Sequence, residues 1–139
     1  MIRYNNNTPF NLSDKKSITN WLLAVIQSEG FVLGEVEYFF CSDEQLLDIN
    51  RSNLNHDTYT DIITFDYTVS NLINADIFIS VERVQENANK FSIDFNEELR
   101  RVMVHGILHL CGYKDKTKEY KLIMTQKEDE KLQMFHVKP

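Results

Sequence analysis

The sequence is poor in the residues that break regular structure. It has four glycines and two prolines among 139 residues, which leaves little room for long flexible linkers. A chain of this length can bury one core of its own. We therefore expect residues 1–139 to form a single domain.

Other absences argue against membrane insertion and export. No apolar run reaches the roughly 20 residues needed to cross a bilayer, so we expect no membrane partner. The first residues, MIRYNNNTPFNLSDKK, lack the apolar core of a signal peptide. Cys41 and Cys111 do not suggest a disulfide framework. These features favour a cytoplasmic protein.

Positive charge is also in short supply. The chain has 15 lysine and arginine residues against 21 acidic residues, a net charge of −6. This balance argues against a protein that coats nucleic acid through a general positive field, and we expect no DNA partner. A local basic patch is still compatible with the composition, because binding depends on the charge near the site.

Apolar spacing along the chain predicts alternating strands and helices. Strands are expected at 2–8, 36–41, 61–69 and 75–81, and helices at 13–30, 42–55, 81–91, 96–112 and from 117 onward. Ser13 is the expected N-cap of the first helix, and Gly30 and Gly112 are expected to end the first and fourth helices. The order βαβαββααα predicts an α+β fold, in which a small mixed β-sheet is packed with several helices.

The stretch HGILHLCGYKD, residues 105–115, has the spacing of a metal site. Four residues advance a helix by about 400° and roughly 6 Å along its axis, so His105 and His109 project from one face. Gly112 can end the helix in the left-handed conformation and turn the chain back, which brings Asp115 around as a third ligand. Three ligands of mixed nitrogen and oxygen type, with one position left for water, are typical of catalytic zinc.

Other interpretations of this stretch are weaker. A single helical histidine on an apolar face is usually a hydrogen-bonded core residue, but two at the ligand offset before a glycine and a carboxylate favour a metal. Cys111 is a competing ligand, although its place near the helix end makes it awkward to direct at the same ion, and ordinary burial also explains it. Zinc peptidases of the H-E-x-x-H type carry a glutamate after the first histidine. Gly106 occupies that position, which disfavours a peptidase.

The same stretch resembles the signature of the YbeY family of bacterial metal-dependent endoribonucleases, usually H-G-x-L-H-L-x-G-Y-D-H. HDTYTDIITF (56–65) is similar to the family segment D-x-P-T-D-V-L-S-F, and ADIFISVERVQENA (75–88) to G-D-I-x-I-S and its following helix. Asn50 also falls where the family has an asparagine. The resemblance implies a zincin-like metal site on a long helix in the C-terminal half, with one Zn²⁺ per chain. It further implies cleavage of single-stranded RNA, above all precursor rRNA, in rRNA maturation and ribosome quality control at the ribosomal small subunit.

Two departures from the family pattern bear on the chemistry. Asp115 stands where the family has its third histidine, and an anionic ligand donates more charge, so we expect a less acidic bound water. The family's arginine upstream of the T-D pair aligns with Leu54. Arg51, one helical turn earlier, is a candidate substitute and a candidate RNA-phosphate contact.

Residues outside the signature can contribute to the reaction. Zinc can supply hydroxide near neutral pH or polarise a phosphoryl oxygen, and the 2′-hydroxyl of RNA is an alternative nucleophile. Thr60 and Asp61 precede a strand, where a loop can face the metal. Asp61 is either a partner for a ligand histidine or a turn carboxylate. His56 is either a proton shuttle or a surface loop histidine.

Lysines cluster immediately after the ligand helix, in YKDKTKEYK. Lys114, Lys116 and Lys118, with Lys121, place positive charge beside the proposed ion, so we expect contacts to RNA phosphates. A solvated surface is the alternative explanation of such a run.

Two rival functions are compatible with the same residues. A non-catalytic ribosome-assembly factor with a structural zinc needs a fourth protein ligand, for which Cys111 and His136 are candidates. A metzincin-like peptidase needs a general base that Gly106 does not supply.

Overall fold

A computed structural model describes residues 1–54 and 58–137. The elements follow the predicted order βαβαββααα, and their bounds are β1 (Ile2–Asn6), α1 (Lys15–Ser28), β2 (Val32–Cys41), α2 (Asp43–Leu54), β3 (Ile62–Asp66), β4 (Leu72–Ser80), α3 (Val81–Phe91), α4 (Phe95–Leu110) and α5 (Lys118–His136). None of the helices in the described ranges has the length and apolar character needed to cross a membrane.

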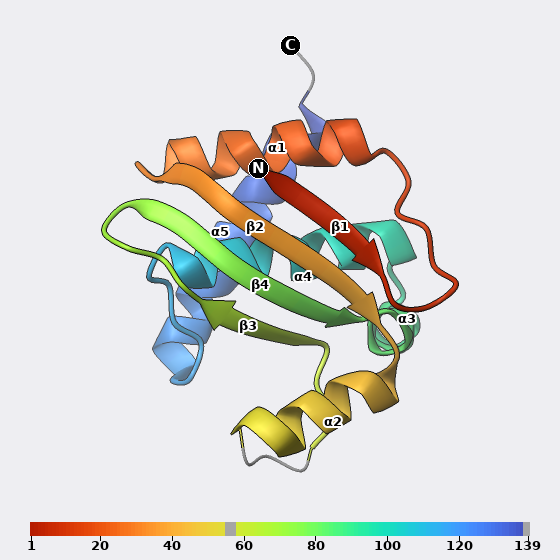
Figure 1. The fold of residues 1–139 in the computed structure, drawn as a ribbon. Coiled ribbons are helices and arrows are strands. Elements are labelled where there is room, and N and C mark those ends of the chain that lie inside the picture. Colours follow the sequence, from red (N-terminus) through yellow and green to blue (C-terminus); the bar gives the residue numbers. More distant parts are fainter. Residues whose placement is uncertain (55–57, 138–139) are drawn as a thin grey trace.

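The four strands form one mixed sheet in the order β1-β2-β4-β3 (Figure 1). β1 and β4 both pair with β2 in parallel, and β3 pairs with β4 in antiparallel orientation. The predicted α+β fold with a small mixed sheet is therefore confirmed. β3 lies at one margin of the sheet, where one of its two sides has no neighbouring strand.

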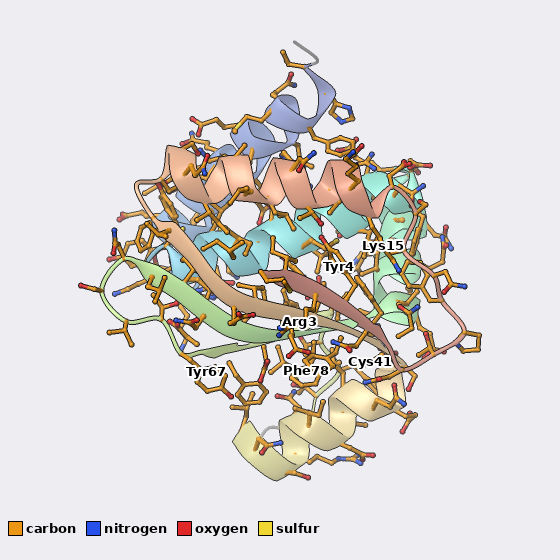
Figure 2. The ribbon with its side chains drawn as sticks, turned by 45° about the horizontal axis from the view of Figure 1, so that its top comes forward. Arg3, Tyr4, Lys15, Cys41, Tyr67 and Phe78 are labelled. Atoms are coloured by element: carbon orange, nitrogen blue, oxygen red, sulfur yellow. The ribbon has the colours of Figure 1, made fainter. Side chains whose placement is uncertain are left out.

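The two faces of the sheet are covered unequally. Every second residue of β2 and β4, for example Tyr38, Phe40 and Ile77, points into the main core, which these strands share with α1 and α4. The phenol of Tyr38 is fully buried and donates a hydrogen bond to the carbonyl oxygen of Met103 in α4 (2.9 Å). α2 lies against the opposite face, where Cys41 and Phe78 belong to a smaller cluster (Figure 2).

α4 lies close against the sheet at one glycine. A Cβ atom at Gly106 would come within 3.2 Å of the terminal carbons of Ile62 in β3 and Ile77 in β4. Asp94 caps the start of this helix by accepting hydrogen bonds from the backbone N–H groups of Asn96 and Glu97. The close approach brings the far end of α4 beside β3, and this places the functional site.

α5 is held against both α4 and α1. Thr117 caps its first turn by accepting a hydrogen bond from the N–H of Tyr120. Near its other end, the indole N–H of Trp21 in α1 donates to the carbonyl oxygen of Lys131 (2.7 Å). The buried ammonium of Lys131 pairs with Glu29 at 2.8 Å. These contacts fix the face that α5 presents to α4.

Several predicted boundaries differ from the observed ones. β2 and β4 begin earlier than expected, at Val32 and Leu72, and β3 ends at Asp66. The ladder between β2 and β4 shifts register between Leu33 and Val36, so the alternation that marks a strand is interrupted there. The predicted N-cap Ser13 is wrong: Asp14 occupies the cap position with a left-handed backbone (φ 56°) and no side-chain cap hydrogen bond.

Candidate metal centre

α4 presents two histidines side by side at its C-terminal end. The ring centroids of His105 and His109 are 5.4 Å apart, with the ring planes nearly perpendicular at 89°. The helix stops just beyond them because Gly112 takes a positive φ of 99°. The N–H of Gly112 donates to the carbonyl oxygen of His109 (3.0 Å), and the N–H of Tyr113 donates to that of Leu108 (3.1 Å). The chain then turns back toward the helix.

The turn brings Asp115 to both histidines. Its Oδ2 lies 3.2 Å from Nε2 of His105, and its Oδ1 lies 3.6 Å from Nε2 of His109. One ligand atom from each of the three residues lies within 4.8 Å of the others. Two imidazole nitrogens and one carboxylate oxygen form a donor set that suits a transition metal such as zinc. The structure therefore brings together the three side chains that the sequence singles out, and this cluster could hold a metal ion.

Glu128 in α5 is part of this site, although the sequence motif does not include it. Its Oε2 lies 2.7 Å from Nδ1 of His105, and its Oε1 accepts a hydrogen bond from Arg101 at 3.0 Å. Arg101 also donates to Asp129 (2.8 Å). Because Nδ1 of His105 is engaged by Glu128, Nε2 is the nitrogen left to face Asp115 and His109.

The electrostatic surroundings of His105 follow from this contact. Burial disfavours the charged imidazolium, but the hydrogen bond and negative charge of Glu128, together with Asp115 and Asp61, raise the pKa of His105 above its usual value.

The sequence does contain one indication that Glu128 has a special role. Glu128 lies on the same face of α5 as the buried residues Met124 and Leu132, where a carboxylate needs a polar partner.

A cleft of about 680 Å³ opens over the cluster. It runs between β3 and α4, and Asn50 and Leu54 at the end of α2 contribute to its wall. Asn50 is buried and donates to the carbonyl oxygen of Thr58 (2.7 Å), which ties α2 to the chain that leads into β3. A cleft of this size admits part of a polymer substrate.

Three of the other predicted site residues also line the cleft, namely Thr60, Asp61 and Lys116. Burial raises the pKa of Asp61, and its backbone carbonyl accepts a hydrogen bond from Ser80. The hydroxyl of Thr60 donates a hydrogen bond to the carbonyl oxygen of Ile62 (3.3 Å). The hydrogen-bond partner of His105 is Glu128, so a direct role of Asp61 toward a ligand histidine stays a prediction.

The remaining basic candidates lie outside the cleft wall. Lys114 places its ammonium over the ring of Tyr120, 5.8 Å from the centroid. Lys118 is exposed at the start of α5. Arg51 is exposed on α2 and is not among the described residues that line the cleft, whereas Leu54 is. Their contacts with RNA stay predictions.

The competing histidines and cysteine are separate from the cluster. Cys111 does not belong to the group of possible ligands within the described chain, and burial raises the pKa of its thiol to about 12. Nε2 of His136 lies 2.8 Å from a carboxylate oxygen of Glu97 instead. His56, considered as a proton shuttle, lies outside the described residues.

The chain is similar to known proteins over nearly its whole length. Residues 2–136 match the family model described as Endoribonuclease YbeY. The chain is 57% identical over 137 residues to the endoribonuclease YbeY of Flavobacterium johnsoniae, and 53% identical over 138 residues to that of Flavobacterium psychrophilum, in each case covering 99% of both chains. A solution structure from Thermotoga maritima superposes with a TM-score of 0.68 at 26% identity, covering 97% of this chain and 89% of that one. The chain therefore belongs to the YbeY endoribonuclease family.

Proposed function

We propose that residues 1–139 form a zinc-dependent endoribonuclease domain that cleaves single-stranded RNA. The observation that carries this proposal is the convergence of His105, His109 and Asp115 at the base of an open cleft. Membership of a family whose curated relatives are named endoribonucleases supports RNA as the substrate. By the resemblance to that family, we further propose action on precursor rRNA at the ribosomal small subunit, in rRNA maturation and ribosome quality control, in the cytoplasm.

The donor set supports zinc as the metal. Two imidazoles and one carboxylate are a common ligand set of catalytic zinc, in which a fourth position is left for water or substrate. Bound by these three side chains, zinc supplies Lewis acidity toward a phosphoryl oxygen and lowers the pKa of water toward neutrality. A structural zinc normally takes four protein ligands, and the group found among the described residues has three.

The surrounding residues hold the site for this chemistry. Glu128 accepts a hydrogen bond from the Nδ1–H of His105 and so fixes the orientation of that ring. Arg101 in turn holds Glu128 by a hydrogen bond. Lys116 lines the cleft beside Asp115, where an ammonium can bind a phosphate of the substrate.

The first turn of α5 extends this basic margin. Lys121 and Glu128 lie seven positions apart, which places them on one face of the helix, and Lys118 lies one turn before Lys121. Glu128 on that face contacts His105, and from this spacing we infer that the two lysines lie on the side of α5 that leads to the cleft. We infer that the RNA backbone approaches along this side.

The experiment that tests the proposal is cleavage of a labelled single-stranded RNA by the wild-type protein, by His109→Ala and by His136→Ala. His109 is a proposed ligand, whereas His136 contacts Glu97 away from the cluster and serves as the matched control. We expect cleavage by the wild type and by His136→Ala, and none by His109→Ala. Bound zinc, measured by elemental analysis, should fall in His109→Ala alone.

Each other outcome points to a different conclusion. Equal cleavage by all three proteins indicates a contaminating nuclease. No cleavage by any protein, with zinc present at full occupancy, rejects the enzyme and favours the assembly factor, with Leu54 at the family arginine position as the first residue to change. Cleavage of casein that depends on His109 would favour the peptidase.

A further inference from the structure

Two turns of α4 before His105, the cleft contains a buried acidic side chain that the metal site does not use. Glu98 lies seven residues before His105, so both point from one face of the helix, about 10 Å apart along its axis. Glu98 is only 5% exposed, yet it lines the cleft. None of the described residues makes a hydrogen bond or ion pair to its carboxyl group that would account for its burial.

The edge of β3 faces the same part of the cleft. At one end of the ladder the carbonyl oxygen of Asp61 accepts a hydrogen bond from the N–H of Ser80, and at the other end the N–H of Tyr67 donates to the carbonyl oxygen of Asn74. Because antiparallel hydrogen bonding alternates, the N–H and C=O groups of Ile62 and Thr64 point away from β4. These two residues and Ile63, whose side chain lies on the opposite face, all line the cleft. The cleft therefore reaches the edge of β3 that has no neighbouring strand.

Part of the wall near these groups is apolar. Ile62 from β3 and Val102 from α4 both line the cleft, and Val102 lies between Glu98 and His105 along the helix. Val102 is one turn from Glu98 and is 4% exposed. An apolar slot with hydrogen-bonding groups on its rim suits a planar ring that has a polar edge.

The charges decide which part of an RNA chain enters this slot. Glu98 and Asp61 are both acidic, whereas the guanidinium of Arg101, which also lines the cleft, is held by Glu128 and Asp129. A phosphate is repelled by acidic groups, whereas an N–H donor is attracted. The phosphates are left to Lys116 and the lysines of α5, so the slot is suited to a nucleobase of the same chain.

We propose that Glu98 and the β3 edge form a subsite for a nucleobase flanking the cleaved bond, and that the subsite selects bases with an exocyclic amino group. A carboxyl oxygen of Glu98 accepts a hydrogen bond from the amino group of cytosine, adenine or guanine, and uracil has no such group. The outward N–H and C=O groups of Thr64 pair with the remaining polar atoms of the base. This inference rests on the proposed function for its ligand, single-stranded RNA.

The test measures binding rather than cleavage. Fluorescence anisotropy compares oligo(C), oligo(A) and oligo(U) of equal length on the His109→Ala protein, which cannot degrade them. We expect oligo(C) and oligo(A) to bind about tenfold more tightly than oligo(U). Replacing Glu98 by alanine should remove this preference by weakening the first two.

A second variant separates recognition from mere structural support. Glu98→Gln keeps an acceptor oxygen and adds an amide donor that can reach the O4 atom of uracil, so oligo(U) binding should strengthen relative to Glu98→Ala. A residue that only supports the fold gives no such gain. Glu97→Gln, on the same helix but outside the cleft lining, is the matched control and should keep the original preference.

The outcomes keep the inference and the proposed function apart. A preference that survives Glu98→Ala, or no preference in the parent protein, overturns the inference even when the wild type cleaves RNA. A preference lost in Glu98→Ala supports the inference even when no cleavage is seen. If an extended peptide displaces the oligonucleotides with no dependence on residue 98, the β3 edge is a strand-pairing site and the inference is overturned.

Discussion

Glu128 is a buried carboxylate that orients His105 without belonging to the group of possible metal ligands. It holds Nδ1 of His105 at 2.7 Å and is itself held by Arg101. Replacing it by glutamine leaves the size of the side chain but removes the charge that favours the Nδ1 proton. We expect Glu128→Gln to weaken zinc binding by about tenfold or more.

A competition titration with a chelator measures this affinity. Asp129→Asn is the matched control, because it removes the other carboxylate that contacts Arg101 without touching His105. Thermal unfolding of both variants shows whether the fold is retained. Unchanged zinc affinity in a folded Glu128→Gln protein would contradict the orienting role.

The ligands and their orienting residue differ in how far the sequence reveals them. His105, His109 and Asp115 can be predicted because helix geometry and one glycine turn place them, and both are local properties. Glu128 lies 23 residues from His105 and depends on how α5 packs against α4. No spacing rule carries that information, and a buried acidic residue in an apolar stripe is the one hint.

Among the secondary-structure elements, α4 packs closely against the sheet at a glycine. Gly106 faces the sheet so closely that an added Cβ meets Ile62 and Ile77 at 3.2 Å. Gly106→Val adds two further methyl groups at this contact. Helix propensity alone would make valine better than glycine by a few tenths of a kcal/mol.

We expect overpacking to outweigh that gain, so that Gly106→Val lowers the free energy of unfolding by about 1–3 kcal/mol. Urea denaturation followed by circular dichroism measures the change. Because Ile62 also lines the cleft, RNA cleavage should fall as well. A protein as stable as the wild type would mean that α4 moves away from the sheet at little cost.

Most elements could be predicted because their apolar positions follow the period of a helix or a strand. The residues that could not be predicted as strand are those where apolar and polar residues do not alternate. The first residues of β2 and β4 include Glu35 and Asn74, which hydrogen-bond to each other through the N–H of Glu35 and the side chain of Asn74 (2.9 Å). At these positions the strand conformation is stabilised by pairing between β2 and β4 rather than by alternating apolar side chains.

Over the whole molecule, the net charge is negative, but positively charged lysines are concentrated in one part of the sequence. The chain carries a net charge of −6, yet Lys116 lines the cleft, and Lys118 and Lys121 follow it in the first turn of α5. If the RNA backbone follows this side, each lysine that binds a phosphate adds to the salt dependence of binding. Lys118→Gln combined with Lys121→Gln should reduce the slope of log affinity against log salt by about 1.4 for a single strand.

The control for this measurement removes equal charge from another part of the surface. Lys15 and Lys16 begin α1, and Figure 2 shows Lys15 away from α2 and the face that it covers. Lys15→Gln combined with Lys16→Gln should leave the slope near the wild-type value. Equal reductions from both pairs would indicate a general effect of net charge.

The three residues that could hold a metal ion all lie between residues 105 and 115. Closing so short a loop costs little chain entropy, and among the described residues neither the sheet nor α5 contributes to this group. If an ion binds there as proposed, its capture requires only α4 and its terminal turn. The cleft, in contrast, needs β3, and the orientation of His105 needs α5. Metal loading and the gain of a working site would then be separate events in the life of the chain.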